Sequence, residues 1–568
     1  MRVPDLLYSQ PYLSVDRRAL EEILGLAFMG RELGTQLHDR LAQARIPPRE
    51  RLRRRALERV AASTSTTAPA TETSPDGSFH PDFFSADLFV ETLVKQSFRI
   101  SLRGRSYPVN AEFLQRVLEH APVDRQTIEM RQAVLRELDE RPELSDRLED
   151  LYVELFDLMS LMKTPGFSGS LDLAAFRLDI LRQLRSVIDR MADDFADAES
   201  ALHRLHTVAI QTQQDEPYGL LRDLLEYESG LAQLGLDVTV GADGSLRSFS
   251  VRSLQENDRN RFYRTPWKRL GDRIRLAFRG YGQSRRELMN RLVNEVFRRL
   301  ADPMVPYVQL LGHLEFYLAS RAFRSEAEGR GLAVCLPEMV EPGTAGLRLV
   351  QCFNPLLLQD PIPPTPAHLE TQPETAVVLI TGPNSGGKTR LLQALGLVQL
   401  LAQSGSYVPC REARLVRQSG LFVSLIEEEG ARATEGRLGR ELVRIRSLFE
   451  RMAPHSLVVL DELCSGTNPS EGIEVFTMVL ELLREVQPTA FVTTHFLDYA
   501  RSLQEQPVID GLEFRQVEVD DELRSTYQFV EGVAATSLAA VTAQRLGVTF
   551  DRLADTIRRR GDDRMDDQ

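Results

Sequence analysis

The chain has 568 residues, of which 42% are hydrophobic and 27% charged, and a formal net charge of -13. One hydrophobic core does not grow to this size, so we expect three or four domains of an ordinary globular protein. The acidic balance disfavours a protein that is covered with nucleic acid, although it allows a local basic groove.

Two further features bear on location. No apolar run approaches the roughly 20 residues that cross a bilayer, and the N-terminus lacks the basic flank and long apolar stretch of a secretory signal. The cysteines Cys335, Cys352, Cys410 and Cys464 lie far apart and form no C-x-x-C pair. We therefore expect reduced thiols, a cytoplasmic protein and no membrane partner.

Residues 1–60 are predicted to form a helical segment, because Leu20, Ile23 and Leu24 begin an apolar stripe at helical spacing. Basic residues crowd positions 49–59, and a solvated helix face explains them better than a nucleic-acid contact does. Residues 61–80 are rich in Ser, Thr, Pro and Ala, which predicts a flexible linker. Neither segment indicates a function.

Residues 81–233 are predicted to form a helical core and lever. Apolar residues recur at i, i+3, i+4 and i+7 in residues 110–118 and 128–138. The turn between these two stretches ends at Asp124, which can cap the second helix. A long helical pattern returns in residues 285–331, and we expect it to pair with the earlier helices.

The intervening residues 234–284 predict a clamp-like basic region. Alternating runs at 236–240 and 246–251, joined by a Gly/Asp turn, predict a β-hairpin. Basic and aromatic residues follow with few acids between them, a pattern typical of contact with a phosphate backbone. A solvated helix face with packed aromatics is the alternative. The candidate DNA-binding residues are Arg259, Arg261, Arg264, Lys268, Arg269 and Arg273.

From residue 332 to 550 strands and helices alternate, which predicts an α/β nucleotide-binding domain. An apolar run at 377–380 predicts a buried strand, and it leads through a glycine-rich loop into a helical pattern. The loop fits G-x-x-x-x-G-K-[ST], in which backbone N–H groups surround a polyphosphate. The predicted ATP-binding residues are Gly382, Pro383, Asn384, Ser385, Gly386, Gly387, Lys388 and Thr389.

Three more side chains complete a predicted ATPase site that uses ATP and Mg²⁺. Lys388 is expected to reach the β- and γ-phosphates, and Thr389 with Asp461 to bind Mg²⁺, because Asp461 ends an apolar strand at 456–460. The next residue, Glu462, is the candidate general base that polarises the attacking water. His495 ends a further strand at 489–494 and is predicted to sense the γ-phosphate, with a purely structural histidine as the alternative.

Four stretches together resemble the ATPase domain of MutS-type proteins. They are TGPNSGGKT at 381–389, GSYVP at 405–409, LVVLDELCSGTNPSEG at 457–472 and TTHF at 493–496. Residues 122–138 look like the start of the family's helical core, and residues 527–548 resemble its C-terminal helix-turn region. The similarity extends from about residue 82 to 550 and is strongest between 376 and 500.

The resemblance implies a mixed fold, in which a mainly α-helical core and lever with a small β-containing clamp precede an α/β P-loop ATPase domain of the ABC type. It also implies a homodimer whose two ATPase domains enclose the nucleotide. Such a dimer would close its clamp on duplex or branched DNA, in mismatch repair or in related DNA repair and recombination.

The sequence departs from the family in three places. The family's Phe-x-Glu mismatch wedge and connector domain have no counterpart ahead of the helical core, which predicts a short form that does not read mismatches in the usual way. A nuclease-like domain is not expected, because a polar tail at 551–568 follows the ATPase. The family's Ser-Thr-Phe loop falls at Gly436, Arg437 and Leu438, so Thr434 or helix N–H groups would have to replace its hydroxyl.

Three functions remain open at this point. The first is an ATP-gated DNA clamp that resets on hydrolysis. The second keeps the ATPase and changes the partner to structured RNA or the ribosome. The third is a non-hydrolysing, ATP-dependent scaffold in which the altered loop abolishes turnover.

Overall fold

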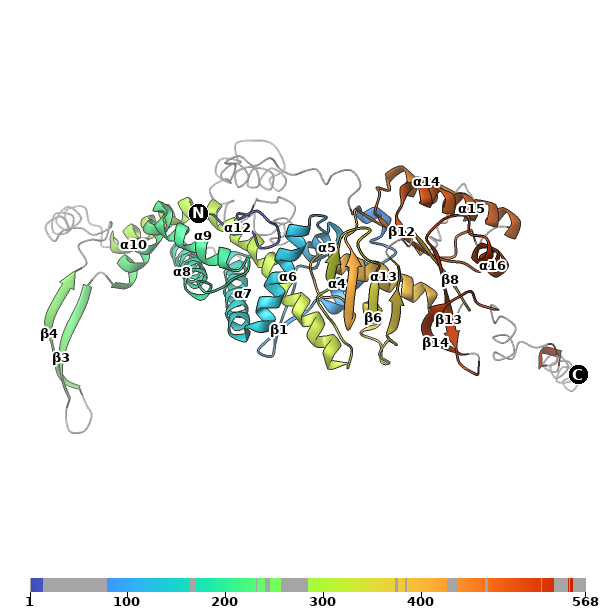
Figure 1. Ribbon diagram of the computed structural model, residues 1–568. Helices are drawn as coiled ribbons and strands as arrows, with labels where there is room; N and C mark the ends of the chain where they lie inside the picture. The colour runs from blue at the N-terminus through green and yellow to red at the C-terminus, as the bar shows by residue number, and fades with distance from the viewer. Residues whose placement is uncertain are drawn as a thin grey trace, which may run out of the picture. The chain divides into compact units, whose positions relative to one another are not determined.

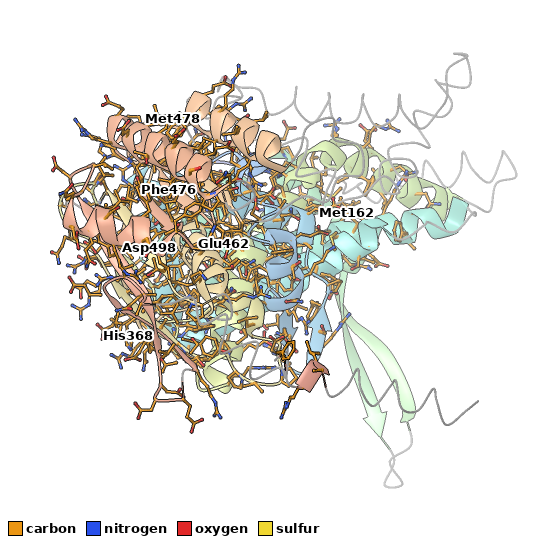
Figure 2. The ribbon with its side chains drawn as sticks, turned by 90° about the vertical axis from the view of Figure 1, so that its right-hand side faces the viewer. Met162, His368, Glu462, Phe476, Met478 and Asp498 are labelled. Carbon is orange, nitrogen blue, oxygen red and sulfur yellow. The ribbon has the colours of Figure 1, made fainter. Side chains whose placement is uncertain are left out.

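The computed structural model describes residues 2–13, 79–163, 170–230, 232–240, 246–256, 284–372, 376–383, 386–425, 437–464, 468–522, 524–535, 550 and 552–554. Figure 1 shows its helices and strands, and Figure 2 shows its side chains. The chain forms two compact units, one of residues 1–70 with 133–318 and one of residues 71–132 with 319–568. The mixed helix-and-sheet class predicted from the sequence is confirmed.

The first unit is mostly helical, as the apolar periodicity predicts. Successive helices pack through fully buried apolar side chains, among them Leu151, Leu184 and Leu205. Among the described residues, its helices are α7 (Pro142–Lys163), α8 (Ser170–Asp194), α9 (His203–Gln214), α10 (Glu216–Gly230), the end of α6 (Arg125–Glu140) and most of α12 (Ser284–Gly329). No helix in the part of the chain that the structure describes is long and apolar enough to cross a membrane.

A β-hairpin extends from this unit between α10 and α12 (Figure 1). Strands β3 (Ala232–Val240) and β4 (Leu246–Glu256) pair antiparallel, with Val238 opposite Phe249. The predicted hairpin is therefore confirmed, and both of its strands are longer than predicted. The six candidate DNA-binding residues between Arg259 and Arg273 lie outside the described residues.

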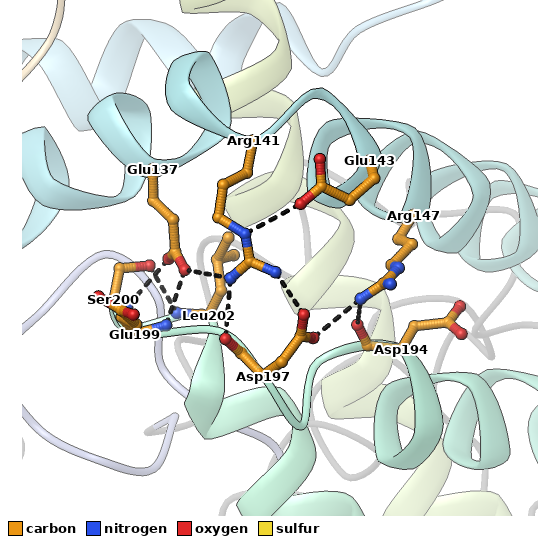
Figure 3. Close-up of polar contacts among 9 residues, drawn as sticks. All are labelled: Glu137, Arg141, Glu143, Arg147, Asp194, Asp197, Glu199, Ser200 and Leu202. Carbon is orange, nitrogen blue, oxygen red and sulfur yellow. Dashed lines mark hydrogen bonds and ion pairs between the residues drawn. The ribbon is translucent and has the colours of Figure 1, made fainter.

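An arginine at the junction of α6 and α7 ties three segments of the first unit together (Figure 3). Arg141 donates to Glu137 Oε1 at 3.3 Å, to Glu143 Oε1 at 3.0 Å and to the Asp197 carbonyl at 2.8 Å, and it also pairs with the Asp197 carboxylate. Arg147 donates to the other Asp197 oxygen at 2.8 Å. Because Asp197 lies between α8 and α9, these bonds hold that connection against the start of α7.

The first residues of the chain are not helical, which differs from the prediction for residues 1–60. Pro4 and Pro11 lack N–H groups, and the Asp5 carboxylate accepts from the N–H of Leu7 at 2.8 Å and of Tyr8 at 2.9 Å, which closes a turn. Arg204 of α9 donates to the carbonyls of four residues, namely Asp5, Tyr8, Ser9 and Gln10, at 2.8–3.0 Å. Residues 14–60 lie outside the description.

A six-stranded sheet forms the core of the second unit, in the order β10-β11-β12-β8-β13-β14. The first five strands are parallel and β14 is antiparallel to β13. The strands are β8 (Val377–Thr381), β10 (Leu421–Ser424), β11 (Leu457–Leu460), β12 (Thr489–Thr493), β13 (Leu512–Val519) and β14 (Ser525–Glu531). All five residues of β8 are buried, because helices and neighbouring strands cover it, as the continuous apolar run predicts.

Helices α13 (Lys388–Gln403), α14 (Arg437–Arg451), α15 (Pro469–Val486) and α16 (Leu497–Glu505) connect or follow these strands. A continuous apolar cluster joins α14 and α15 to the sheet, with Ile445, Phe476 and Val458 among its members. A second, four-stranded sheet contains β5 (Glu338–Val340), β9 (Glu412–Val416), β6 (Arg348–Cys352) and β7 (Ala367–Glu370), in that order.

The N-terminal part of the second unit consists of short elements. They are η1 (Pro81–Phe83), α4 (Val90–Ser97), β1 (Ile100–Leu102), β2 (Arg105–Tyr107), α5 (Ala111–Glu119) and the beginning of α6. The predicted cap is confirmed, since Asp124 Oδ1 accepts from the Thr127 N–H at 2.7 Å.

Two stretches that carry the family resemblance contact each other inside this unit. Arg131 of α6 is fully buried and donates to the Ser404 carbonyl at 3.0 Å. Gly405 follows with a φ of 74°, and a Cβ there would lie 2.7 Å from the Arg131 Cβ. The close approach and the left-handed backbone both require glycine at the start of GSYVP.

Candidate nucleotide site

The glycine-rich loop lies at the carboxyl end of the parallel strands. It joins the end of β8 to the start of α13, and β12 separates β8 from β11 in the sheet. The residues that follow β11 and β12 therefore reach the same sheet edge as the loop, where α/β folds bind ligands.

Glycines shape the loop because side chains would collide there. Gly382 has a φ of 142°, and a Cβ on it would lie 2.7 Å from the Val517 Cβ. A Cβ on Gly386 would lie 2.8 Å from the Pro383 carbonyl oxygen. Gly387 has a φ of 84° and directly precedes α13. Asn384 and Ser385, the remaining predicted loop residues, lie outside the described part.

Lys388 is the first residue of α13 and is buried, with 4% of its surface exposed. Its ammonium group donates to the carbonyls of Gly382 at 3.0 Å and Pro383 at 3.1 Å. Burial lowers the pKa of this ammonium, whereas the negative charges of Glu462 and Asp461 act to raise it. A cation is thus held inside the curve of the loop.

Asp461 directly follows β11 and is held by two hydroxyl groups. Thr389 Oγ1 donates to one carboxylate oxygen at 2.5 Å, and Thr493 Oγ1 donates to the other at 2.5 Å. The Thr493 hydroxyl also accepts from the Glu462 N–H at 2.7 Å. The structure therefore brings together three predicted residues, and it adds Thr493, which the sequence reasoning missed.

Glu462, labelled in Figure 2, is partly exposed at this edge and has a left-handed backbone with a φ of 48°. His495 lies two residues beyond the end of β12 and is exposed, and its ring centroid is 4.2 Å from that of Phe496. Among the described residues, His495 makes no hydrogen bond with Lys388, Asp461 or Glu462. The structure thus brings Glu462 into the cluster and leaves His495 beside it.

Tyr527 is a second residue that the sequence reasoning did not single out. Its ring borders the loop, since a Cβ on Gly387 would lie 3.0 Å from the ring carbon Cδ1. Ser525 Oγ donates to the Gly386 carbonyl at 3.3 Å, which holds the start of β14 against the loop. The ring is 47% exposed and so leaves a face for stacking. In the sequence Tyr527 begins the stretch 527–548 that resembles the family's helix-turn region, and the structure differs there, because residues 525–531 form strand β14.

The donor set suits a magnesium nucleotide. Mg²⁺ in such sites takes one or two protein oxygens together with phosphate oxygens and water, and Thr389 with Asp461 supplies such a pair. Within the described ranges, no group of three or more His, Cys, Asp or Glu residues is placed to hold a metal by itself. Gly436, where the family's Ser-Thr-Phe loop would begin, and Thr434, the residue that could replace its hydroxyl, lie outside those ranges.

Comparison with known proteins identifies relatives of this region. Residues 378–553 match the family model of MutS domain V. The chain is 34% identical over 242 residues to an endonuclease MutS2 of Streptococcus gordonii. These residues make up 42% of this chain and 29% of that protein. It is 34% identical over 265 residues to an endonuclease MutS2 of Thermus thermophilus, covering 46% and 34%. A third relative of that name, from Halothermothrix orenii, is 27% identical over 404 residues, covering 67% and 48%. The matches span about a third of the first two relatives and about half of the third.

Proposed function

Because this chain is a MutS-family protein, we propose that its second unit binds and hydrolyses ATP and that the protein is an ATP-gated DNA clamp. The observation that carries the proposal is one carboxylate, Asp461, bonded to both Thr389 of the loop and Thr493 of β12. This arrangement joins the phosphate loop to the end of β11, where the candidate metal ligand Asp461 and the candidate base Glu462 follow, and to the end of β12.

The chain's own groups divide the work of phosphoryl transfer. The loop N–H groups and Lys388 bind the β- and γ-phosphates, and Thr389 with Asp461 would hold Mg²⁺. When bound, that ion would neutralise phosphate charge. Glu462 orients a water and accepts its proton while the water oxygen bonds to the γ-phosphorus and the bond to the leaving oxygen of ADP breaks.

Two further assignments belong to the proposal. Tyr527 stacks on the base of the nucleotide, because its exposed ring borders the loop. His495 senses the γ-phosphate from the end of β12, and this role requires its ring to turn from Phe496 when nucleotide binds.

The clamp part of the proposal rests on the chain's family and on the basic stretch that follows β4. We propose a homodimer that encloses ATP between two copies and closes on duplex or branched DNA in repair or recombination. ATP can favour the closed state only by contacting it better than the open one. The residues proposed to contact DNA are Arg259, Arg261, Arg264, Lys268, Arg269 and Arg273.

Steady-state ATP hydrolysis tests this function. It is measured alone and with homoduplex, mismatched duplex, a four-way junction and ribosomal RNA, with Glu462→Ala as the control. Turnover that one DNA form stimulates and that the variant loses supports the clamp. Stimulation by ribosomal RNA alone transfers the assignment to an RNA partner, and tight ATP binding without phosphate release makes the protein a scaffold.

A charge-reversal variant tests the DNA contact separately. Arg264→Glu with Lys268→Glu should weaken DNA binding and reduce the slope of log K against log salt by about 2, because each lost phosphate contact removes about one unit. Unchanged affinity and slope would contradict the clamp assignment while leaving the ATPase intact.

A further inference from the structure

The turn that carries Glu462 has a backbone that needs support. Glu462 has a φ of 48° and Cys464 a φ of 62°, so two residues with a Cβ adopt the left-handed region within three positions. Such backbone persists only where the surrounding structure holds it. One support is Thr493, whose hydroxyl accepts from the Glu462 N–H at 2.7 Å.

The second support comes from α14, outside the loop and strand ends described above. Glu441 Oε1 accepts from the Cys464 N–H at 2.5 Å. The Cys464 side chain is fully buried and Leu463 is 4% exposed, so these two side chains pack into the interior. Glu462 in the same turn stays partly exposed. A carboxylate acceptor gives a stronger bond to an N–H than a neutral one does.

The negative charge of Glu441 also affects the Cys464 thiol. The pKa of the Cys464 thiol is raised to about 12, first by burial and then by the negative charge of Glu441. The Glu441 carboxylate thus accepts from the Cys464 N–H and lies close enough to act on the thiol of the same residue.

The position of α14 is itself held by a residue from the beginning of this unit. One turn after Glu441, Arg444 pairs with the carboxylate of Asp87 and donates to the Val423 carbonyl at 2.9 Å. Asp87 is 4% exposed and also accepts from the Leu425 N–H at 3.0 Å. The segment around Asp87 thereby joins the end of β10 to α14.

We propose that Glu441 is a positioning residue for the general base Glu462, and that Asp87 holds α14, through Arg444, where Glu441 can reach the turn. The inference rests on the proposed function, since it gives these carboxylates a task in ATP hydrolysis. It implies that Asp87, which lies about three hundred positions before the nucleotide loop in the sequence, affects the rate of the chemical step.

The test separates positioning from folding by using matched variants. Glu441→Ala removes the acceptor and should lower kcat roughly tenfold to a hundredfold, as a misplaced catalytic group does, with KM for ATP little changed because Lys388 and Thr389 are untouched. Glu441→Gln keeps an oxygen acceptor and should restore most of kcat. Glu450→Ala removes an exposed acid of the same helix and serves as the control. Asp87→Ala should lower kcat in the same direction by a smaller factor.

A second readout does not require turnover. Hydrogen exchange at the Cys464 amide should accelerate in Glu441→Ala and in Asp87→Ala, and it should stay slow in Glu441→Gln and Glu450→Ala. Exchange at the Val459 amide in β11 should be unchanged in all four, which shows that the sheet stays folded.

The outcomes are distinguishable. If the wild-type protein hydrolyses no ATP, the proposed function fails, and exchange at Cys464 alone decides whether Glu441 and Asp87 hold the turn. If the wild type is active and Glu441→Ala has the same kcat, or if Cys464 exchange does not change, the positioning role is overturned and the ATPase assignment stands.

Discussion

The hydroxyl group of Thr493 supports both Asp461 and Glu462 in the candidate site. It donates to Asp461 Oδ1 at 2.5 Å, accepts from the Glu462 N–H at 2.7 Å and is fully buried. Thr493→Val keeps the volume of the side chain and removes both bonds. We expect the variant to lose stability in the second unit and to lose most ATP turnover. The reason is that the candidate metal ligand Asp461 and the candidate base Glu462 are both held by this hydroxyl.

The magnitude follows from the two bonds. A hydrogen bond to a charged group contributes about 1.5–3 kcal/mol, and a buried N–H left without an acceptor costs about 1–3 kcal/mol. Neighbouring contributions do not add fully, so we expect a loss of about 3 kcal/mol. In a unit of this size such a loss lowers the Tm by about 5 °C.

The assay is thermal unfolding of the second unit together with steady-state hydrolysis. Thr493→Ser is the control, since serine keeps a hydroxyl and loses only a methyl group. A valine variant that melts with the wild type and hydrolyses ATP at the same rate would refute the reasoning. A serine variant as impaired as valine would show that the methyl group, and not the hydroxyl, matters.

Three further changes test other parts of the molecule. Arg141→Ala should destabilise the first unit at neutral pH: the pKa of Asp197 lies below its usual 3.8, chiefly through the bond to Arg141, so this stabilisation exists above the unfolded pKa and disappears as pH falls through the folded one. The free energies of unfolding of the wild type and the variant should therefore converge as the pH falls into the acid range. Gly405→Ala should cost about 2 kcal/mol in urea unfolding, because its φ is 74° and its Cβ would meet Arg131. Tyr527→Ala should weaken ATP binding about tenfold by calorimetry, whereas Tyr527→Phe keeps the ring and the affinity.

The sequence by itself determined the local units of the candidate site. The apolar run, the glycine-rich loop and the helical pattern after it lie within one short segment, so their order and spacing can be recognised in the sequence. The structure shows β8 and α13 at these positions. The hairpin at β3 and β4, the cap at Asp124 and the long helix α12 follow for the same reason. Alternation, capping and helical periodicity are local properties of a chain.

The tertiary structure decided which distant side chains meet. Thr493 bonds to Asp461 because β12 lies beside β11, and Tyr527 borders Gly387 because β14 pairs with β13, and neither neighbour can be known from spacing along the chain. The same holds for Asp87, which lies 357 positions from Arg444. In residues 2–13 the tertiary structure overrides the prediction from the sequence. Bonds from Arg204 and local bonds to Asp5 hold a turn where a helix was predicted. Long-range pairing depends on which surfaces pack together, and packing is a property of the whole fold rather than of any one segment.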